Sequence, residues 1–238
     1  MKLRNKNLKI LKSNHVYSEE MEHDACGVGL VASTEGLKSR KVVEYGIDAL
    51  KAVWHRGAID ADGKTGDGAG IHIEIPKDFF EEKIEVTGHK HDNSELCVGM
   101  IFLPRNDYSA QEQCRTIVES ELTKRNFSIY GWRQVPVDPS VLGEKAEQTR
   151  PEITQVLFTY NDKKVVNKSL EQKLYETRRV IEKEALNNQL NNFYICSFSS
   201  KSIIYKGMFL AEALSDFYTD LKDERFISRY AIFHQRFS

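Results

Sequence analysis

The amino-acid sequence predicts an α+β domain in which helices cover antiparallel sheets. Runs rich in β-branched and aromatic residues dominate the 238-residue chain, and short turn signals join several of them without an intervening helix. Antiparallel strands can follow one another through short turns, whereas parallel strands need a long crossover, so these turns favour antiparallel pairing. The length suits one large domain with its own core, and no repeat of fixed period occurs.

The first predicted strand begins at Cys26. Residues 1 to about 24 are basic and polar without a clear period, whereas the run Cys-Gly-Val-Gly-Leu-Val-Ala-Ser from Cys26 onward is small and apolar. A short apolar run bounded by Thr34 and Gly36 is typical of a buried strand. A leader and a folded domain are therefore expected to meet between Ala25 and Cys26.

Spacing of the apolar residues predicts the later elements. Ser39 is a suitable N-cap for a helix that Gly57 would end, with an apolar face of Val43, Ile47, Leu50 and Trp54. Isoleucines alternate with polar residues over 71–75, which predicts a half-buried strand. Further strands are predicted over 96–103, 155–160, 193–198, 202–209 and 226–237, and helices over 108–125 and 168–187. Ser199-Ser200-Lys201 is a hairpin signal.

Charge and hydropathy exclude several classes of partner. The chain has 34 basic and 35 acidic residues, so it lacks the overall field that collects nucleic acid or anionic lipid. No apolar run approaches the ~20 residues of a membrane-spanning helix. The first 25 residues lack the apolar core of a signal peptide, so the expected location is the cytosol or an organelle matrix.

The cysteines and histidines do not have metal-site spacing. Cys97, Cys114 and Cys196 lie in apolar stretches and are predicted to be reduced core thiols. No metal site is expected at His23, His55 or His234. The glycine-rich segment 65–70 lacks the Gly-Lys-Ser/Thr ending of a phosphate-binding loop and precedes a strand, so we reject a nucleotide site there.

Removal of the leader would give Cys26 a chemical role. A free α-amine with a pKa of ~7.7–8.0 can take the thiol proton, directly or through water, so that one residue supplies nucleophile and base. Gly27 and Gly29 would let a substrate approach the strand closely. Composition alone favours the alternative, in which Cys26 is another core thiol at a strand start.

Several blocks of sequence resemble, in order and spacing, the opening of glutamate synthase large subunits. They are His-Asp-Ala-Cys-Gly-Val-Gly (23–29), Trp-His-Arg-Gly-Ala (54–58), Thr-Gly-Asp-Gly-Ala-Gly-Ile (65–71), Trp-Arg-Gln-Val-Pro (132–136), Leu-Gly-Glu (142–144), Tyr-Lys-Gly-Met (205–208) and Phe-His-Gln-Arg-Phe-Ser (233–238). The region resembles other type II glutamine amidotransferases, which are N-terminal-nucleophile hydrolases. The resemblance implies a four-layer αββα sandwich with antiparallel sheets, C-terminally incomplete in this chain.

The resemblance also implies roles for particular residues. Residues 1–25 match a propeptide, and Cys26 matches the nucleophile of the amidotransferase domain, 26–238. Arg236 matches the arginine that pairs with the substrate α-carboxylate, which suits the two-pronged guanidinium, and Phe237 would help to wall that pocket. Arg56 and Gly57 match the pair that orders the N-terminus. Bland alternatives are a helix-end charge for Arg56 and an edge-strand charge for Arg236.

The expected function is therefore the glutaminase part of glutamate synthase, which hydrolyses L-glutamine through a Cys26 thioester. The family's Asn-Gly oxyanion hole and the acidic residue that grips the substrate amine come after Ser238, as do domains with FMN and an iron–sulfur cluster that add ammonia to 2-oxoglutarate. Implied partners are those domains and either ferredoxin or a nicotinamide-nucleotide-dependent small subunit, in the cytoplasm or plastid stroma. Two alternatives remain: a catalytically incompetent docking module of a split synthase, and another type II amidotransferase.

Overall fold

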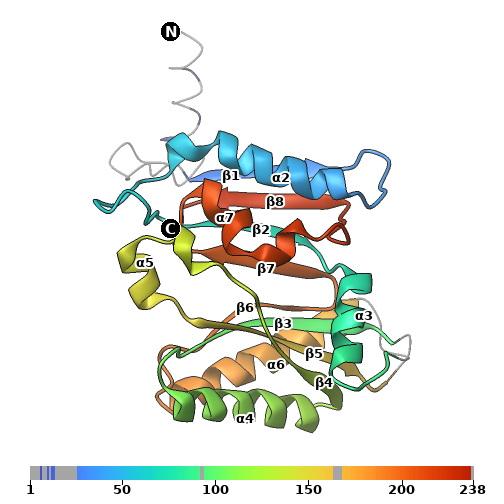
Figure 1. Cartoon of the computed structure of the whole chain (residues 1–238). Helices are drawn as coiled ribbons and strands as arrows, with labels where there is room; N and C mark the ends of the chain where they lie inside the picture. The colour runs from blue at the N-terminus through green and yellow to red at the C-terminus, as the bar shows by residue number, and fades with distance from the viewer. Residues whose placement is uncertain are drawn as a thin grey trace.

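The computed structural model describes residues 6, 10, 12, 13, 26–91, 94–162 and 168–236. In this part of the chain two four-stranded antiparallel sheets are flanked by helices, as Figure 1 shows. This confirms the predicted α+β class with antiparallel sheets, and it is consistent with an N-terminal-nucleophile hydrolase fold. The expected propeptide falls almost entirely outside the described residues.

The two four-stranded sheets are joined in the chain through one edge strand of each. The first has the order β1-β8-β2-β7, with β1 (Gly27–Ala32), β2 (Ala69–Glu74), β7 (Ser202–Gly207) and β8 (Tyr230–Gln235). The second has the order β4-β5-β3-β6, with β3 (Leu96–Leu103), β4 (Phe127–Gln134), β5 (Glu152–Tyr160) and β6 (Tyr194–Ser199). The turn after β6 therefore carries the chain from one sheet to the other.

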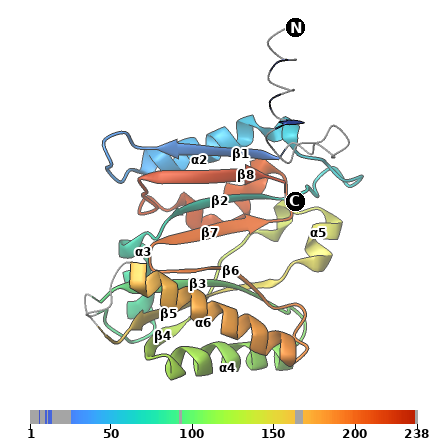
Figure 2. The ribbon, with the colours of Figure 1, turned by 180° about the vertical axis from the view of Figure 1, so that it is seen from behind.

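Helices cover different faces of the two sheets. Helix α2 (Arg40–Ala52) packs on β8 and β1, and the Ser39 hydroxyl accepts the N–H of Lys41 at 3.2 Å, so the predicted N-cap is confirmed. Helices α4 (Tyr108–Lys124) and α6 (Lys168–Asn187) pack on the second sheet, and Figure 2 shows α6 in front of its strands. Shorter helices are α3 (Lys77–Val86), α5 (Glu144–Thr149) and α7 (Leu214–Phe217). No helix in the described ranges is long and apolar enough to cross a bilayer.

Burial divides the interior into two hydrophobic cores. The first joins α2 to both sheets, with fully buried Leu50, Ile71 and Leu157 as representatives. The second lies between the second sheet and the helices α4 and α6, and it includes Leu122 and Leu174. Because apolar burial is the dominant favourable term in folding, the sheets are held together mainly through the first core.

A buried polar network also joins the sheets. The Arg133 guanidinium of β4 donates two hydrogen bonds to Asp220, of 2.7 and 2.5 Å, and one of 2.6 Å to Gln155 of β5. Tyr205 of β7 donates to Asp220 at 3.3 Å and accepts from Gln155 at 3.2 Å. The Asp220 side chain is 4% exposed, so these groups exchange few hydrogen bonds with water.

Several sequence predictions agree closely with the structure, and three need correction. The predicted strand 96–103 and helix 168–187 have the observed bounds. The first strand is not buried: it is an edge strand, and its outer face leaves Val28 and Leu30 69% and 63% exposed. Sequence reasoning missed α3, β4, α5 and α7. In β4 a bulge between Ile129 and Gly131 interrupts the period of two.

The hairpin predicted around residues 199–201 is also wrong, because β6 and β7 pair within different sheets. The Ser197 hydroxyl accepts the N–H of Ile204 at 3.2 Å, and the thiol of Cys196 donates to the Ile204 carbonyl at 3.5 Å. The N–H and C=O of Ile204 are thus bonded to side chains of β6, whereas in a hairpin they would pair with the β6 backbone. The predicted helix after Ser39 ends at Ala52, before Trp54, which begins the 3₁₀ turn η1 (Trp54–Arg56).

Candidate active site

Cys26 lies at the end of the first sheet where β1 and β2 begin and β8 ends. Gly27 of β1 and Ala69 of β2 both lie opposite Gln235 of β8. Cys26 directly precedes β1, and Arg236 directly follows β8. The antiparallel register therefore brings Cys26 and Arg236 to the same end of the sheet, and Cys26 is exposed.

Arg236 is held by the segment that precedes β2. Its backbone N–H donates to the carbonyl of Gly68 at 2.8 Å, and its Nε lies 2.9 Å from Oδ2 of Asp67. Arg236 has a φ of 78°, in the left-handed region that non-glycine residues rarely adopt. Such strained residues cluster at functional sites, where the surrounding structure holds them in place.

Gly57 fits its position because the backbone passes very close to β8. A Cβ at Gly57 would lie 2.2 Å from Nε2 of the Gln235 side chain, so a larger residue there would force that buried side chain to move. The Gly57 N–H ends η1 by donating to the carbonyl of Trp54 at 3.0 Å. Arg56 is the last residue of η1, and its side chain lies outside the described part of the structure. Phe237 is also outside it.

Gln235 has an unusual side chain for the end of a strand. It is 1% exposed, yet its Oε1 has no hydrogen-bond partner within the described ranges. Buried polar atoms are almost always paired, and unpaired ones cost roughly 1–3 kcal/mol. The unpaired oxygen lies on the residue that is paired with Gly27, next to the candidate nucleophile.

The loop between η1 and β2, residues 57–68, is rigid and acidic, and we call it the acidic loop. Asp62 accepts the hydroxyl of Thr65 at 2.5 Å and its N–H at 2.7 Å, and these bonds, led by the hydroxyl, lower the pKa of Asp62. Lys145 of α5 donates to Asp60 at 2.7 Å, which lowers the pKa of Asp60. Across the loop, the backbone N–H of Asp60 also donates to the carbonyl of Thr65 at 2.9 Å. The loop is therefore fixed both internally and to α5.

The remaining cysteines are buried, as predicted. Burial raises the pKa of Cys114 to about 11 and that of Cys196 to about 12, and it raises the pKa of Cys97 well above its usual range. These thiols stay protonated at neutral pH, and thiols are poor nucleophiles. Cys26 is the one exposed cysteine in the described part of the chain. Among those residues, no group of three His, Cys, Asp or Glu side chains is placed to hold a metal.

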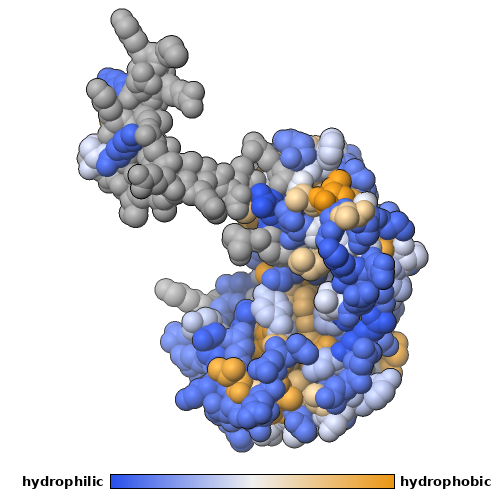
Figure 3. All heavy atoms as spheres, turned by 90° about the vertical axis from the view of Figure 1, so that its left-hand side faces the viewer, coloured by the Kyte–Doolittle hydropathy of each residue, from blue (hydrophilic) through white to orange (hydrophobic). Residues whose placement is uncertain are grey.

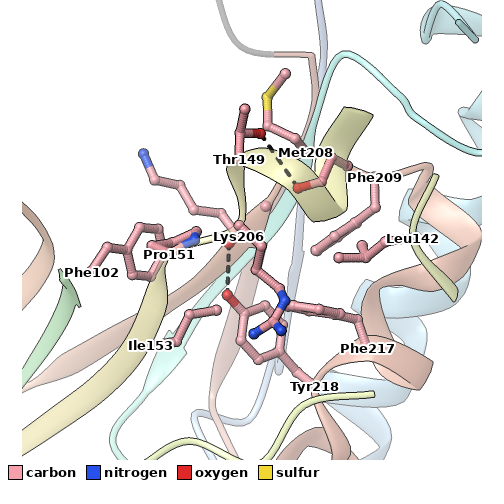
Figure 4. A pocket seen from close by; sticks show the side chains of 13 residues that line it. Phe102, Leu142, Thr149, Pro151, Ile153, Lys206, Met208, Phe209, Phe217 and Tyr218 are labelled. Atoms are coloured by element: carbon pink, nitrogen blue, oxygen red, sulfur yellow. Dashed lines mark hydrogen bonds between the residues drawn. The ribbon is translucent and has the colours of Figure 1, made fainter. Parts of the chain in front are cut away.

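A separate cavity of about 160 Å³ opens between α5 and the end of β7. In Figure 3, which looks at the side that carries α5, apolar side chains lie in a hollow surrounded by polar ones. Figure 4 shows the cavity wall, where Tyr218 donates to the carbonyl of Lys206 at 2.8 Å. Phe102, Ile153 and Phe217 contribute apolar surface to the cavity. Arg150 and Lys206 also line the cavity, so two basic side chains lie beside the apolar ones.

Sequence reasoning missed two residues of this edge, Asp67 and Gln235. Both stand inside blocks that carried the family resemblance, but Asp67 was considered only as part of a possible phosphate loop. As predicted, the glycine-rich segment leads into a strand, β2, and not into a helix. The available signal was an acidic residue between two glycines, Gly66 and Gly68, which indicates a carboxylate held close to backbone.

Known proteins match nearly the whole chain. Residues 26–238 match the class-II glutamine amidotransferase family. The chain is 56% identical over 232 residues to a glutamate synthase [NADPH] large chain of Azospirillum brasilense, covering 98% of this chain and 15% of that protein. It is 37% identical over 233 residues to a chloroplastic ferredoxin-dependent glutamate synthase 2 of Arabidopsis thaliana, covering 96% and 14%. A glutamate synthase [NADPH] large chain of Bacillus subtilis is 35% identical over 230 residues, covering 95% and 15%. The chain thus spans only a small part of the length of these relatives.

Proposed function

Because the chain belongs to the class-II glutamine amidotransferases, we propose that it is the glutaminase part of a glutamate synthase large chain, with Cys26 as the nucleophile. The observation that carries the proposal is the strand register, which places Cys26 and Arg236 at one sheet edge. The family match that begins at Cys26 supports removal of residues 1–25 as a propeptide. The 56% identity to a glutamate synthase supports the choice of enzyme within the family.

The proposed reaction passes through a thioester. The free α-amine of Cys26 takes the thiol proton, and the sulfur bonds to the side-chain amide carbon of L-glutamine. The carbon–nitrogen bond of the resulting tetrahedral intermediate breaks, the nitrogen accepts a proton from the amine, and ammonia leaves. Water then attacks the thioester, which releases glutamate and restores the thiol. The exposure of Cys26 at the start of β1 supports access for glutamine.

The other proposed site residues bind and orient. Arg236 pairs with the α-carboxylate of glutamine, and Phe237 forms part of the pocket wall. Arg56 and Gly57 order the new N-terminus, for which the contact between Gly57 and Gln235 is the structural support. The guanidinium of Arg236 suits the α-carboxylate because it offers two parallel charge-assisted hydrogen bonds.

The ammonia would be passed to 2-oxoglutarate in domains outside residues 26–238. The resemblance implies that the FMN and the iron–sulfur cluster would be held there. The names of relatives suggest either NADPH or ferredoxin as the electron source. A cytoplasmic or plastid-stromal location is consistent with these names.

The test replaces the nucleophile in the complete synthase chain. Cys26→Ala is expected to abolish glutamine-dependent glutamate formation and to leave synthesis from added ammonia partly intact, because the two chemistries use separate sites. Cys114→Ala is the matched control, since it removes a buried thiol of α4 in the second core. Mass spectrometry of the active protein should find Cys26 at the N-terminus. Activity from a chain that still begins at Met1 would rule out this mechanism. Absence of ammonia release from the complete chain would instead favour the alternative, a catalytically incompetent docking module.

A further inference from the structure

Asp67 connects three segments that are far apart in the sequence. Its Oδ2 accepts the backbone N–H of Ala58 at 3.1 Å, next to the Arg56-Gly57 pair. The same oxygen lies 2.9 Å from Nε of Arg236, at the end of β8. Asp67 itself directly precedes Gly68, whose carbonyl accepts the Arg236 N–H. The acidic loop thus contacts Arg236 twice: the Gly68 carbonyl binds its backbone N–H, and the Asp67 carboxylate binds its side chain.

This grip contributes little to stability. The Asp67 and Arg236 side chains are 32% and 29% exposed, and ion pairs that reach water typically add little to folding. Side chains of a strand point alternately to its two faces, but Arg236, with its left-handed φ, no longer follows this pattern. The strand β8 alone therefore does not fix the direction of the Arg236 side chain. The Asp67 contact constrains this direction, because it holds Nε and with it the plane of the guanidinium.

The acidic loop is rigid enough to act as this constraint. Asp60 is paired with Lys145 of α5, and Asp62 is bonded twice to Thr65. At Gly66 a Cβ would lie 2.8 Å from the carbonyl oxygen of Phe209, so the loop also packs tightly against the chain that follows β7. Asp67 is therefore carried by a segment that is anchored on two sides.

We propose that Asp67 is a positioning residue that orients Arg236 for the α-carboxylate of glutamine. This inference rests on the function proposed above. The contact uses Nε, which is not one of the two terminal nitrogens that form the fork for a carboxylate. Asp67 acts through Arg236 and not on the reacting atoms, so it affects recognition of the carboxylate and not the reactivity of the Cys26 thiol.

The test compares two reagents that alkylate Cys26 in the complete, processed chain. A chloroketone analogue of glutamine carries the α-carboxylate, whereas iodoacetamide does not, and each forms a thioether at sulfur and releases a halide. Asp67→Ala is expected to slow alkylation by the chloroketone roughly tenfold to a hundredfold, the loss of about one charge-assisted hydrogen bond. Alkylation by iodoacetamide should change less than about twofold, the scatter expected from a distant substitution. Asp67→Glu should recover part of the lost rate.

Two further variants complete the design. Asp216→Ala is the matched control, because it removes an exposed, ion-paired carboxylate outside the acidic loop and leaves the Arg236 contact, and neither rate should change. Arg236→Ala should slow the chloroketone reaction, and adding Asp67→Ala should have no further effect. Equal slowing of both reagents by Asp67→Ala would show a merely structural role and overturn the proposal.

The same measurements separate this inference from the proposed function. If Arg236→Ala slows the chloroketone and Asp67→Ala does not, the positioning role fails and the proposed function stands. If Arg236→Ala leaves the chloroketone rate unchanged, the carboxylate role of Arg236 fails and both are overturned. If the chloroketone does not select Cys26 at all, the proposed nucleophile is wrong.

Discussion

Substitution of Asp220 by alanine tests whether the buried polar network holds the two sheets together. Asp220→Ala would leave the Arg133 guanidinium, whose side chain is 13% exposed, with its bond to Gln155 but without its carboxylate. Tyr205 would also lose its acceptor. Burial, followed by the charge of Asp220, raises the pKa of Tyr205 well above its usual range, so its hydroxyl is a donor at any ordinary pH.

The expected cost follows from the burial of the pair. Removing one partner of a buried ion pair typically costs ~3–5 kcal/mol, because the other charge remains buried without compensation. Domains of ordinary stability unfold at a cost of about 5–15 kcal/mol, so Asp220→Ala should remove a large fraction of the free energy of unfolding. Replacing both residues, with Arg133→Met and Asp220→Leu, should recover much of the loss because no unpaired charge is left.

Urea unfolding followed by circular dichroism measures this effect. With a slope of ~2–3 kcal/mol/M, the midpoint for Asp220→Ala should fall by about 1 M or more. Asp216→Ala is the matched control, because the side chains of Asp216 and its partner Lys222 are both 56% exposed and such a pair is worth ~0–1 kcal/mol. A loss below about 1 kcal/mol for Asp220→Ala, within the range of an exposed pair, would refute the idea that this network links the sheets.

Four further predictions concern the sheet edge and the fold. Iodoacetamide at pH 8 should label Cys26 and spare the buried thiols of Cys97, Cys114 and Cys196, whose pKa values burial raises; even labelling of all four in a peptide map would contradict a selected nucleophile. Gly57→Ala should cost ~1–3 kcal/mol in thermal unfolding and lower glutaminase activity, because the added Cβ overlaps Gln235; an unchanged melting temperature would disprove the close contact. Burial lowers the pKa values of His72 and His234, so below about pH 6.5 the unfolded chain takes up protons that the folded chain does not, and stability should fall; urea midpoints that do not differ between pH 7.5 and 5.5 would exclude this linkage. The 238-residue chain alone should release ammonia at least ~10²-fold more slowly than a chain extended through the expected oxyanion hole, and a gap within about tenfold would place those donors inside this sequence.

The fold could be predicted where local pattern and burial agree. The strand 96–103 is buried on both faces and is bounded by polar turns, and helix 168–187 has a clear apolar stripe, so each was predicted with its observed bounds. Elements whose pattern is broken were missed, because the bulge of β4 and the short length of α5 hide their periods. The exposure of β1 could not be predicted, since the sequence does not say which strand lies at an edge.

The candidate site shows a similar division. Cys26, Gly57 and Arg236 were identified through family motifs, and the register brings two of them to one edge. Asp67 was missed because its role depends on a contact between residues on different segments, which no spacing rule along the sequence reveals. Motifs indicate which residue types matter, but the partner of a charged group is decided by tertiary structure.

The pairing of β1 with β8 also bears on how the protein is made. Within the described ranges β1 pairs with β8 alone, and its partner is roughly 200 residues later in the chain, which a ribosome needs on the order of 10–40 s to synthesise. During that interval the backbone N–H and C=O groups of β1 have no partner strand, so they are open to pairing with other chains. A leader still attached would keep the amine of Cys26 in a peptide bond throughout translation. Removal of the leader after β8 has paired with β1 would give the thiol its base only once the sheet beside it is closed.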